Sequence, residues 1–379
     1  MTNLILPPST IGIIGGGQLG RMMAISAKQM GYKVAVLEPA ALGPLAQVAD
    51  LEINAPYDSE EALTQLLAVS DVVTYEFENI DSHVVEKLAS AGYIPQGYRP
   101  LAMTQHRYIE KTSINNCGFK TAPFEKVDNF NDLKNAIKKI GYPSILKTVS
   151  GGYDGKGQYL IEKKEDLQLN EQAIKAILTE QNLIFEAICR FEYEASVIVA
   201  RDILGNIQVF PPSINQHIHG VLFSSSVGEE LSPEVEQEMT KIATKIAEAG
   251  NLVGVCGVEF FVTKGQQVLV NEIAPRPHNS GHYTIEACNI SQFDQHILAI
   301  TGRPLVPIKL NDSALMINIL GQHMGQLEET IQQYPEAMLH FYGKDEAKDQ
   351  RKMGHFTVLV EDAHALLESQ FLQSWRQTF

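Results

Sequence analysis

The chain has 379 residues, 44% of them apolar and 20% charged, which is typical of an ordinary globular protein, and its length allows two or three domains. Its formal net charge of −15 argues against a general nucleic-acid or membrane-surface binder, because such proteins need broad positive fields. The cysteines are scattered without a CxxC pair, and neither a signal-peptide pattern nor an apolar stretch of about 18 residues occurs, so we expect a cytoplasmic protein without a disulfide framework.

The N-terminal region predicts a Rossmann-like opening. A short strand over Ile11 to Ile14 leads into the glycine turn 15–20, a helical pattern, and a second strand that ends in Glu38. This fits GxGxxG and suggests a dinucleotide site. The signal is weak, because such turns also bind mononucleotides or phosphorylated substrates through helix N-terminal amides.

The next elements end in acidic residues. Asp58 and Glu61 form a capping-box pattern that opens a helix, and a strand over Asp71 to Tyr75 runs into Glu76-Phe77-Glu78. Acids just beyond a strand lie where open α/β sheets bind ligands, although a loop of solvated charges is an equal alternative. Pro and Gly residues then place a boundary near residue 100, and a helix is predicted over 104–116.

A glycine-rich segment at 151–157 lies between two predicted strands. The first strand, Ser144 to Thr148, carries Lys147, and the second begins at Gln158. A P-loop would need a following helix and a Ser or Thr after its Lys, and both are missing. We therefore predict a mobile hairpin flap whose amides close over phosphates while Lys147 and Lys156 supply charge.

Further strands are predicted over Leu183 to Ile188 and Ala195 to Arg201. The segment between them joins two lobes and is a candidate adenine slot, because backbone groups there can read the base edge. His217 and His219 form an HxH pair that could bind zinc, but without a third ligand nearby a surface or substrate contact fits better.

The strand patterns at 255–262 and 267–273 predict a β-hairpin. If Gly265-Gln266 is a two-residue loop, Glu259 faces Glu272 at roughly 4.5–5.5 Å between Cβ atoms, and a turn at Lys264-Gly265 makes them diagonal neighbours. Two such carboxylates repel each other unless a cation lies between them, and oxygen ligands suit Mg²⁺. A solvated strand face is the alternative.

Basic and polar residues follow the hairpin. Two prolines hold Arg276 in an extended segment, where its guanidinium could bind a carboxylate or phosphate, and the histidines of 278–282 lie in a segment too polar for the core. A smaller unit after about residue 300 contains a strand at 314–320. Its cluster Lys344, Arg351 and Lys352 suits a substrate phosphate, with a solvated patch as the alternative.

Five motifs in order, GGGQLGRM, YEFEN, GGYDGKGQ, NEIAPRPHNSGH and RKMGH, give a resemblance over nearly the whole length. The chain resembles the ATP-grasp superfamily and, within it, the 5-(carboxyamino)imidazole ribonucleotide synthase family. The resemblance implies an α/β and α+β fold: a Rossmann-like pre-ATP-grasp domain over 1–100, an ATP-grasp domain over 101–300 with a flap subdomain at 118–190, and a small β-rich domain over 301–379.

The resemblance also implies an activity. It is the carboxylation of 5-aminoimidazole ribonucleotide with bicarbonate through carboxyphosphate, with release of ADP and phosphate, in purine biosynthesis. The implied cofactors are ATP and Mg²⁺, or Mn²⁺ in its place. The implied partners are these small molecules and a second copy of the chain, with no nucleic acid or membrane.

The resemblance assigns roles residue by residue. ATP contacts would fall on Arg107, Lys147, Gly152, Tyr153, Asp154, Gly155, Lys156, Gly157, Gln158, Glu186, Ala187, Ile188, Cys189, Glu194, His217, Asn271 and Glu272. Mg²⁺ would bind Glu259 and Glu272. Ribonucleotide contacts would fall on Gln18, Leu19, Glu76, Tyr153, Asp154, Asn279, Ser280, His282, Lys344, Arg351 and Lys352. Catalysis would involve Lys147, Asp154, Arg276 and His278.

Three positions depart from the family pattern, with Ala187 and Cys189 where an aromatic residue and Pro are usual, and His106 where Asp is usual. Three other functions stay open: a formate-dependent ribonucleotide transformylase, a nicotinamide-dependent oxidoreductase that would explain the glycine turn alone, and a nucleotide-binding regulator without catalysis.

Overall fold

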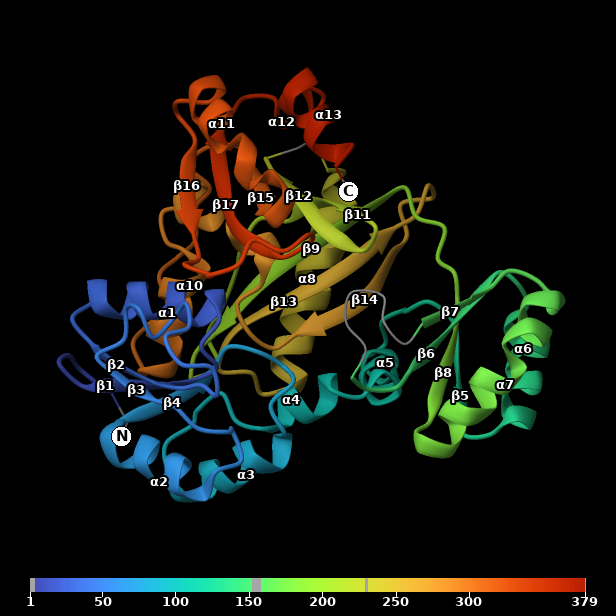
Figure 1. The fold of residues 1–379 in the computed structure, drawn as a ribbon, viewed down its shortest axis with the longest axis horizontal. Helices are drawn as coiled ribbons and strands as arrows, with labels where there is room; N and C mark the ends of the chain where they lie inside the picture. The colour runs from blue at the N-terminus through green and yellow to red at the C-terminus, as the bar shows by residue number, and fades with distance from the viewer. Residues whose placement is uncertain (1–3, 152–157, 229–230, 379) are drawn as a thin grey trace.

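The computed structural model describes residues 4–151, 158–228 and 231–378. Within these ranges the chain forms three sheets (Figure 1). No helix in the described part of the chain combines the length and apolarity that crossing a membrane requires.

The N-terminal sheet is parallel, with strand order β3-β2-β1-β4. Its elements are β1 (Thr10–Ile14), α1 (Gln18–Gln29), β2 (Lys33–Leu37), β3 (Leu51–Ile53), α2 (Glu60–Val69), β4 (Val72–Tyr75) and α3 (Ser82–Ala91). Because α1 and α10 (Gln292–Ile300) cover one face and α2 and α3 the other, the inner strands β1 and β2 are buried at every residue after the first. The predicted Rossmann-like opening is confirmed. The cap of α2 was wrong by one residue, because the Ser59 side chain, and not Asp58, accepts the Ala62 amide.

Two helices then lead to the second sheet, α4 (Arg99–Thr104) and α5 (Arg107–Asn116). The single helix predicted over 104–116 was wrong, since the chain breaks at His106, which is extended. The break has a physical cause: the Arg107 amide donates to the Val149 carbonyl at 2.8 Å, which ties the start of α5 to the end of β6 (Ser144–Thr148).

The second sheet, here called the flap sheet, is antiparallel with order β5-β8-β6-β7. Its other elements are β5 (Phe124–Val127), α6 (Phe130–Ile140), β7 (Gln158–Ile161), α7 (Lys164–Glu180) and β8 (Leu183–Ala187). Strands β6 and β7 pair from Ser144 with Ile161 to Lys147 with Gln158, so the predicted hairpin strands are confirmed. The glycine-rich segment between them, at 152–157, lies outside the described residues.

The large sheet has nine strands in the described chain, in the order β14-β13-β9-β11-β12-β15-β17-β16, with β10 on β9. These strands are β9 (Tyr193–Arg201), β10 (Ile207–Val209), β11 (Ser213–Ile218), β12 (Val221–Val227), β13 (Gly254–Val262), β14 (Val268–Ala274), β15 (Ala314–Leu320), β16 (Met338–Phe341) and β17 (Lys352–Leu359). The accompanying helices are α8 (Pro233–Ala249), α9 (Thr284–Ala287), α11 (Leu327–Gln333), α12 (Ala363–Leu367), α13 (Gln370–Arg376) and the 3-10 turns η1 (Asn279–Gly281) and η2 (Gly321–Gln326).

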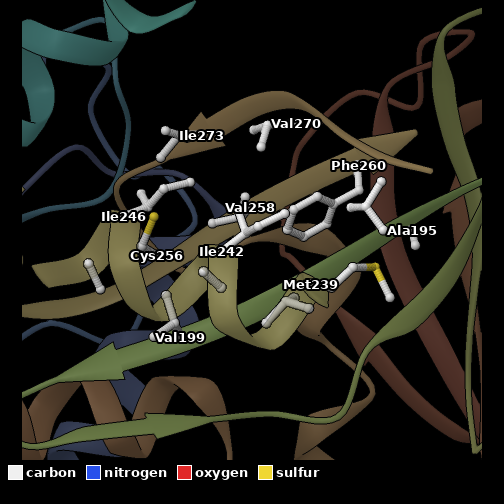
Figure 2. Packing of buried hydrophobic residues seen from close by; sticks show 14 of the residues in the cluster. Ala195, Val199, Met239, Ile242, Ile246, Cys256, Val258, Phe260, Val270 and Ile273 are labelled. Atoms are coloured by element: carbon white, nitrogen blue, oxygen red, sulfur yellow. The ribbon is translucent and has the colours of Figure 1, made fainter. Parts of the chain in front are cut away.

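The core of the large sheet is built where α8 packs on β9, β13 and β14. Figure 2 shows Met239, Ile242 and Ile246 of α8 facing Val258 and other apolar side chains of these strands. Each fully buried side chain of this size contributes roughly 1.5–3 kcal/mol. The strands that carry the carboxylate hairpin therefore rest on a rigid apolar layer.

The C-terminal strands continue this same sheet. Ser224 of β12 pairs with Ile317 of β15, and the pairing runs on to Val227 with Ala314. The predicted small β-rich unit is therefore joined to the central part by backbone hydrogen bonds. Its predicted boundary near residue 300, like the boundary near residue 100, stays a prediction.

Candidate active site

A cleft of about 460 Å³ lies where the large sheet meets the flap sheet and the N-terminal region. The predicted site residues that line it are Arg107, Lys147, Gln158, Glu194, His217, Glu259, Asn271, Glu272, Arg276, His278, Asn279 and Lys352. Glu78, one of the acids after the strand that ends at Tyr75, also lines it. Other predicted residues do not line it: Gln18, Leu19, Glu76, Glu186, Ala187, Ile188, Cys189, Ser280, His282, Lys344 and Arg351. Gly152, Tyr153, Asp154, Gly155, Lys156 and Gly157 lie outside the described residues.

The carboxylate hairpin has a different turn from either one predicted. Its loop has three residues, 264–266, closed by the Thr263 amide donating to the Gln267 carbonyl, and Gln266 takes the left-handed conformation with φ 58°. Val262 therefore lies opposite Val268. That register alone would place Glu272 on the far face of the strand.

A β-bulge restores the predicted pairing. Val258 pairs with Ile273 and Phe260 pairs with Val270, so Glu259 opposes both Asn271 and Glu272. All three side chains line the cleft. Burial and the neighbouring Glu272 charge raise the pKa of Glu259 to about 7, as expected for two acids that share a site without a cation.

His278 approaches this pair from the segment after β14. Its Nε2 lies 3.3 Å from a carboxylate oxygen of Glu259, and its Nδ1 lies 2.8 Å from Ser280 Oγ. Burial and the charge of Arg276 lower the pKa of His278 well below its usual range, so the imidazole is neutral near pH 7. His278 therefore adds no positive charge beside the acid pair.

Two lysines converge on Glu186 at the border with the flap sheet. Lys147 Nζ lies 3.0 Å and Lys111 Nζ lies 3.7 Å from the same oxygen of Glu186. Burial would raise the pKa of Glu186, but the two ammonium groups hold it below its usual value. Glu186 itself does not line the cleft, whereas both lysines do.

The candidate adenine slot has an aromatic wall that sequence reasoning missed. Phe191 and Phe261 stack with ring centroids 4.8 Å apart, and Phe261 lines the cleft. His217 Nδ1 donates to a carboxylate oxygen of Glu194 at 2.8 Å, which raises the pKa of His217 although its burial would lower that pKa. His219 is exposed on the turn after β11, away from this contact.

The N-terminal glycine turn is filled by the chain's own carboxylates. The Gly20 amide donates to Glu76 at 2.6 Å, the Gly17 amide also donates to Glu76, and the Gly16 amide donates to Glu38 at 2.7 Å. A Cβ added at Gly17 would lie 2.7 Å from Glu76 Oε1. The glycines are therefore needed for these acids, and the amides that a dinucleotide would use are occupied.

The two neighbours predicted to contact the ribonucleotide at this turn differ in exposure. Gln18 is half-buried at the start of α1, whereas the Leu19 side chain packs into the core of the N-terminal sheet. Only the backbone of Leu19 is therefore in a position to meet a ligand.

Arg276 is held by the second acid of the YEFEN motif. Its Nε donates to Glu78, and its Nη1 donates to the Pro277 carbonyl at 3.1 Å. Burial would lower the pKa of Arg276, but Glu78 raises it, so the guanidinium stays charged beside the carboxylate pair. Sequence reasoning assigned Arg276 to the site and left Glu78 open between a ligand site and a solvated loop, and it missed their pairing.

The side-chain amide of Asn279 is buried at the cleft without a hydrogen-bond partner among the described residues. Neither its Oδ1 nor its Nδ2 has a hydrogen-bond partner among the described residues, although the side chain is buried at the cleft. Such groups cost free energy unless a ligand or water satisfies them. His282, by contrast, is fully buried behind the cleft against His355.

The predicted phosphate cluster lies beside the N-terminal region. Lys344 Nζ donates to the Lys352 carbonyl at 2.7 Å, and Gln47 donates to the Gly343 carbonyl at 2.6 Å. Burial and the charges of Arg351 and Lys352 lower the pKa of Lys344 to about 8. Three cations held this closely favour an anionic ligand.

Comparison with known proteins agrees with this geometry. The ribonucleotide synthetase preATP-grasp domain matches residues 9–105, the ATP-grasp domain 112–293, and the phosphoribosylaminoimidazole carboxylase C-terminal domain 314–369. The N5-carboxyaminoimidazole ribonucleotide synthase of Bacillus subtilis is 47% identical over 358 residues, 94% of this chain and 93% of that protein.

Solved structures of such enzymes match over the whole chain. An ADP complex of N5-carboxyaminoimidazole ribonucleotide synthetase is 45% identical, with a TM-score of 0.94 and full coverage of both chains. The Aspergillus clavatus N5-carboxyaminoimidazole synthase in complex with ADP and 5-aminoimidazole ribonucleotide is 29% identical, with a TM-score of 0.89 and full coverage of both chains. The chain therefore belongs to the N5-carboxyaminoimidazole ribonucleotide synthase family of ATP-grasp enzymes.

Proposed function

We propose that this protein carboxylates 5-aminoimidazole ribonucleotide with bicarbonate, using ATP, and forms N5-carboxyaminoimidazole ribonucleotide, ADP and phosphate in purine biosynthesis. One observation carries the proposal: a single cleft gathers Lys147 and the bulged Asn271-Glu272 pair together with Arg276 and Lys352. The first three suit a nucleoside triphosphate, and the last two suit a second anionic substrate beside it.

The paired carboxylates fit a divalent cation. Repulsion by Glu272 and burial raise the pKa of Glu259, and a cation between the two would relieve that repulsion. Within the described ranges no cluster of three or more His, Cys, Asp or Glu side chains forms a metal site, and Mg²⁺ commonly needs only one or two carboxylates plus phosphate oxygens. Glu259 and Glu272 would hold Mg²⁺, which neutralises phosphate charge when bound.

Lys147 and Arg276 would bind and orient the reacting groups. Bicarbonate is a poor electrophile until the γ-phosphoryl group passes to one of its oxygens, with cleavage of the bond to ADP, to give carboxyphosphate. Lys147 would neutralise charge on the transferring group, and Arg276, held charged by Glu78, would orient bicarbonate for in-line attack. Carboxyphosphate then breaks its C–O bond to release phosphate and CO₂, and the amine of the ribonucleotide forms a bond to the CO₂ carbon and loses a proton.

The ribonucleotide would lie towards the C-terminal strands. Lys344, Arg351 and Lys352 would bind its phosphate, and the unsatisfied amide of Asn279 would contact it. The roles of 152–157, the homodimer and a cytoplasmic location stay predictions.

Measurement of ADP release tests the proposal. Purified protein is assayed in CO₂-depleted buffer with bicarbonate or formate, with and without the ribonucleotide, and labelled bicarbonate is followed into an acid-labile product. We expect ADP only with bicarbonate, fastest with the ribonucleotide present. Turnover with formate would instead support a formate-dependent transformylase of the same superfamily, and hydride transfer to a nicotinamide would support an oxidoreductase.

A further inference from the structure

The β-bulge that aims Asn271 and Glu272 into the cleft interrupts the hydrogen bonds of β14. This strand is the last in the order of the large sheet, so backbone groups that turn away from β13 need other partners. Just before the bulge, the outward-facing amide of Val270 donates to the Lys120 carbonyl at 2.8 Å. At the bulge itself the partners are side chains.

Two adjacent residues of α5 supply these side chains. The Ile273 amide donates to Glu110 Oε1 at 2.7 Å, and Lys111 Nζ donates to the Asn271 carbonyl at 3.4 Å. The two contacts lie on either side of Glu272, so α5 holds the bulged segment at both ends. Lys111 is in turn fixed by Glu186 at 3.7 Å.

Burying the charged side chains of Glu110 and Lys111 costs free energy, which their hydrogen bonds to β14 offset only in part. Glu110 and Lys111 are each only 3% exposed, on a helix whose other buried side chain is Ile114. Burial and the nearby Glu272 charge raise the pKa of Glu110 to about 8. An apolar residue would pack here without that cost but could not accept the Ile273 amide.

We propose that Glu110, assisted by Lys111, is a positioning residue that locks the bulge of β14 and so fixes the direction of Asn271 and Glu272. Glu110 borders the cleft, and the role proposed for it is carried by its hydrogen bond to the β14 backbone. The inference rests on the proposed function, because it assigns Glu272 to the cation and Asn271 to ATP.

Three variants test the inference. Glu110→Ala removes the acceptor, Glu110→Gln keeps an amide oxygen in the same place, and Ile109→Ala is a control on the same helix at a side chain that is 46% exposed. Each is assayed for kcat, for KM of ATP, and for the Mg²⁺ concentration that gives half-maximal rate. Mn²⁺ binding in the presence of ADP, followed by electron paramagnetic resonance, gives a readout independent of turnover.

For Glu110→Ala we expect kcat and Mn²⁺ affinity to fall about 10–100-fold, because a misaligned ligand loses geometry while the cleft remains. KM for ATP should rise as well, because Asn271 loses its direction, whereas Glu110→Gln and Ile109→Ala should both stay close to the parent. If Glu110→Gln fails as badly as Glu110→Ala, the carboxylate charge and not the hydrogen bond is required, and the inference is overturned.

Failure of the proposed cation site and failure of the Glu110 inference give different results. A parent that does not bind Mn²⁺ with ADP refutes the cation site and the inference with it, whereas a Glu110→Ala variant that binds Mn²⁺ as tightly as a functioning parent overturns the inference alone. If Glu110→Ala does not fold, hydrogen exchange of the Ile273 amide in the parent decides. Slow exchange, as for a buried bonded amide, supports the lock, and exchange at the rate of a free amide overturns it.

Discussion

Replacing Glu186 by Gln removes the carboxylate that lies between Lys111 and Lys147. Its oxygen is 3.0 Å from one ammonium group and 3.7 Å from the other. The side chains of Glu186 and Lys111 are each 4% exposed, so water cannot solvate the Lys111 ammonium group once the carboxylate is gone. We therefore expect Glu186→Gln to destabilise the protein far more than removal of a surface charge would.

The magnitude follows from the burial and the distances. At an effective dielectric constant of about 20, each contact carries about 4–6 kcal/mol before desolvation is subtracted. Breaking a buried ion pair at one partner costs about 3–5 kcal/mol in practice. With an unfolding entropy of about 2.1 cal/mol/K per residue over 379 residues, this lowers the Tm by about 4–6 °C.

The pH dependence has a definite sign. Lys111 and Lys147 hold the folded-state pKa of Glu186 below its unfolded value, so the stabilisation is present above the unfolded pKa of about 4.3 and is lost as pH falls through the folded pKa. The Tm difference between parent and Glu186→Gln should therefore be constant from pH 5 to 7 and should shrink below about pH 4.

Thermal unfolding followed by circular dichroism measures this difference. The matched control is Glu125→Gln, which breaks a 3.0 Å contact with Lys139 on the surface of the same flap sheet, where the lysine side chain is 65% exposed. Such a pair is worth about 0.2–1 kcal/mol, or about 1 °C. A Tm for Glu186→Gln within 1 °C of this control at pH 7 would refute the reasoning.

Three further changes test the proposed site. Glu272→Gln should reduce kcat by at least about 100-fold with an unchanged circular dichroism spectrum, because half of the carboxylate pair is neutralised, and full turnover at saturating Mg²⁺ would contradict the cation site. Arg351→Ala should weaken ribonucleotide binding about tenfold or more, as measured by calorimetry, because a charge-assisted phosphate bond is worth about 1.5–3 kcal/mol. Its affinity for ATP should match that of the parent. A ribonucleotide affinity equal to that of the parent would contradict the phosphate cluster. The pKa of Lys344 is lowered to about 8, so its side chain is positively charged below that pH and neutral above it. KM for the ribonucleotide should therefore rise up to tenfold per pH unit above about pH 8 in the parent but not in Lys344→Arg. Parallel pH profiles of the two proteins would exclude this role of Lys344.

The carboxylate pair could be predicted because apolar alternation assigns each strand residue to a face, but its register could not. Gly265 suggested a two-residue turn, whereas the left-handed residue is Gln266, in a three-residue loop. This shifts the register by one residue, and the bulge at Asn271-Glu272 shifts it back. The three-residue turn and the bulge shift the register in opposite directions, and no local sequence pattern predicts either of them.

The contacts of α5 were missed for a different reason. Glu110 meets Ile273 across 163 positions of the chain, and nothing near either residue marks the other as its partner. The only available signal was a pair of charged residues beside Ile114 on an otherwise amphipathic helix. The glycine turn shows the converse case, since a local motif typical of pyrophosphate binding accommodates Glu38 and Glu76 instead.

The continuity of the large sheet limits how this protein can be dissected. A fragment ending near residue 300 would lose β15, the neighbour of β12, and would expose the edge of a strand in which every residue is buried. The released piece would carry β15, ALMINIL, which is also buried throughout. Both open edges are templates for pairing with other chains, so either fragment expressed alone should aggregate. The substrate binding proposed for the C-terminal residues therefore has to be studied by point substitution in the intact chain.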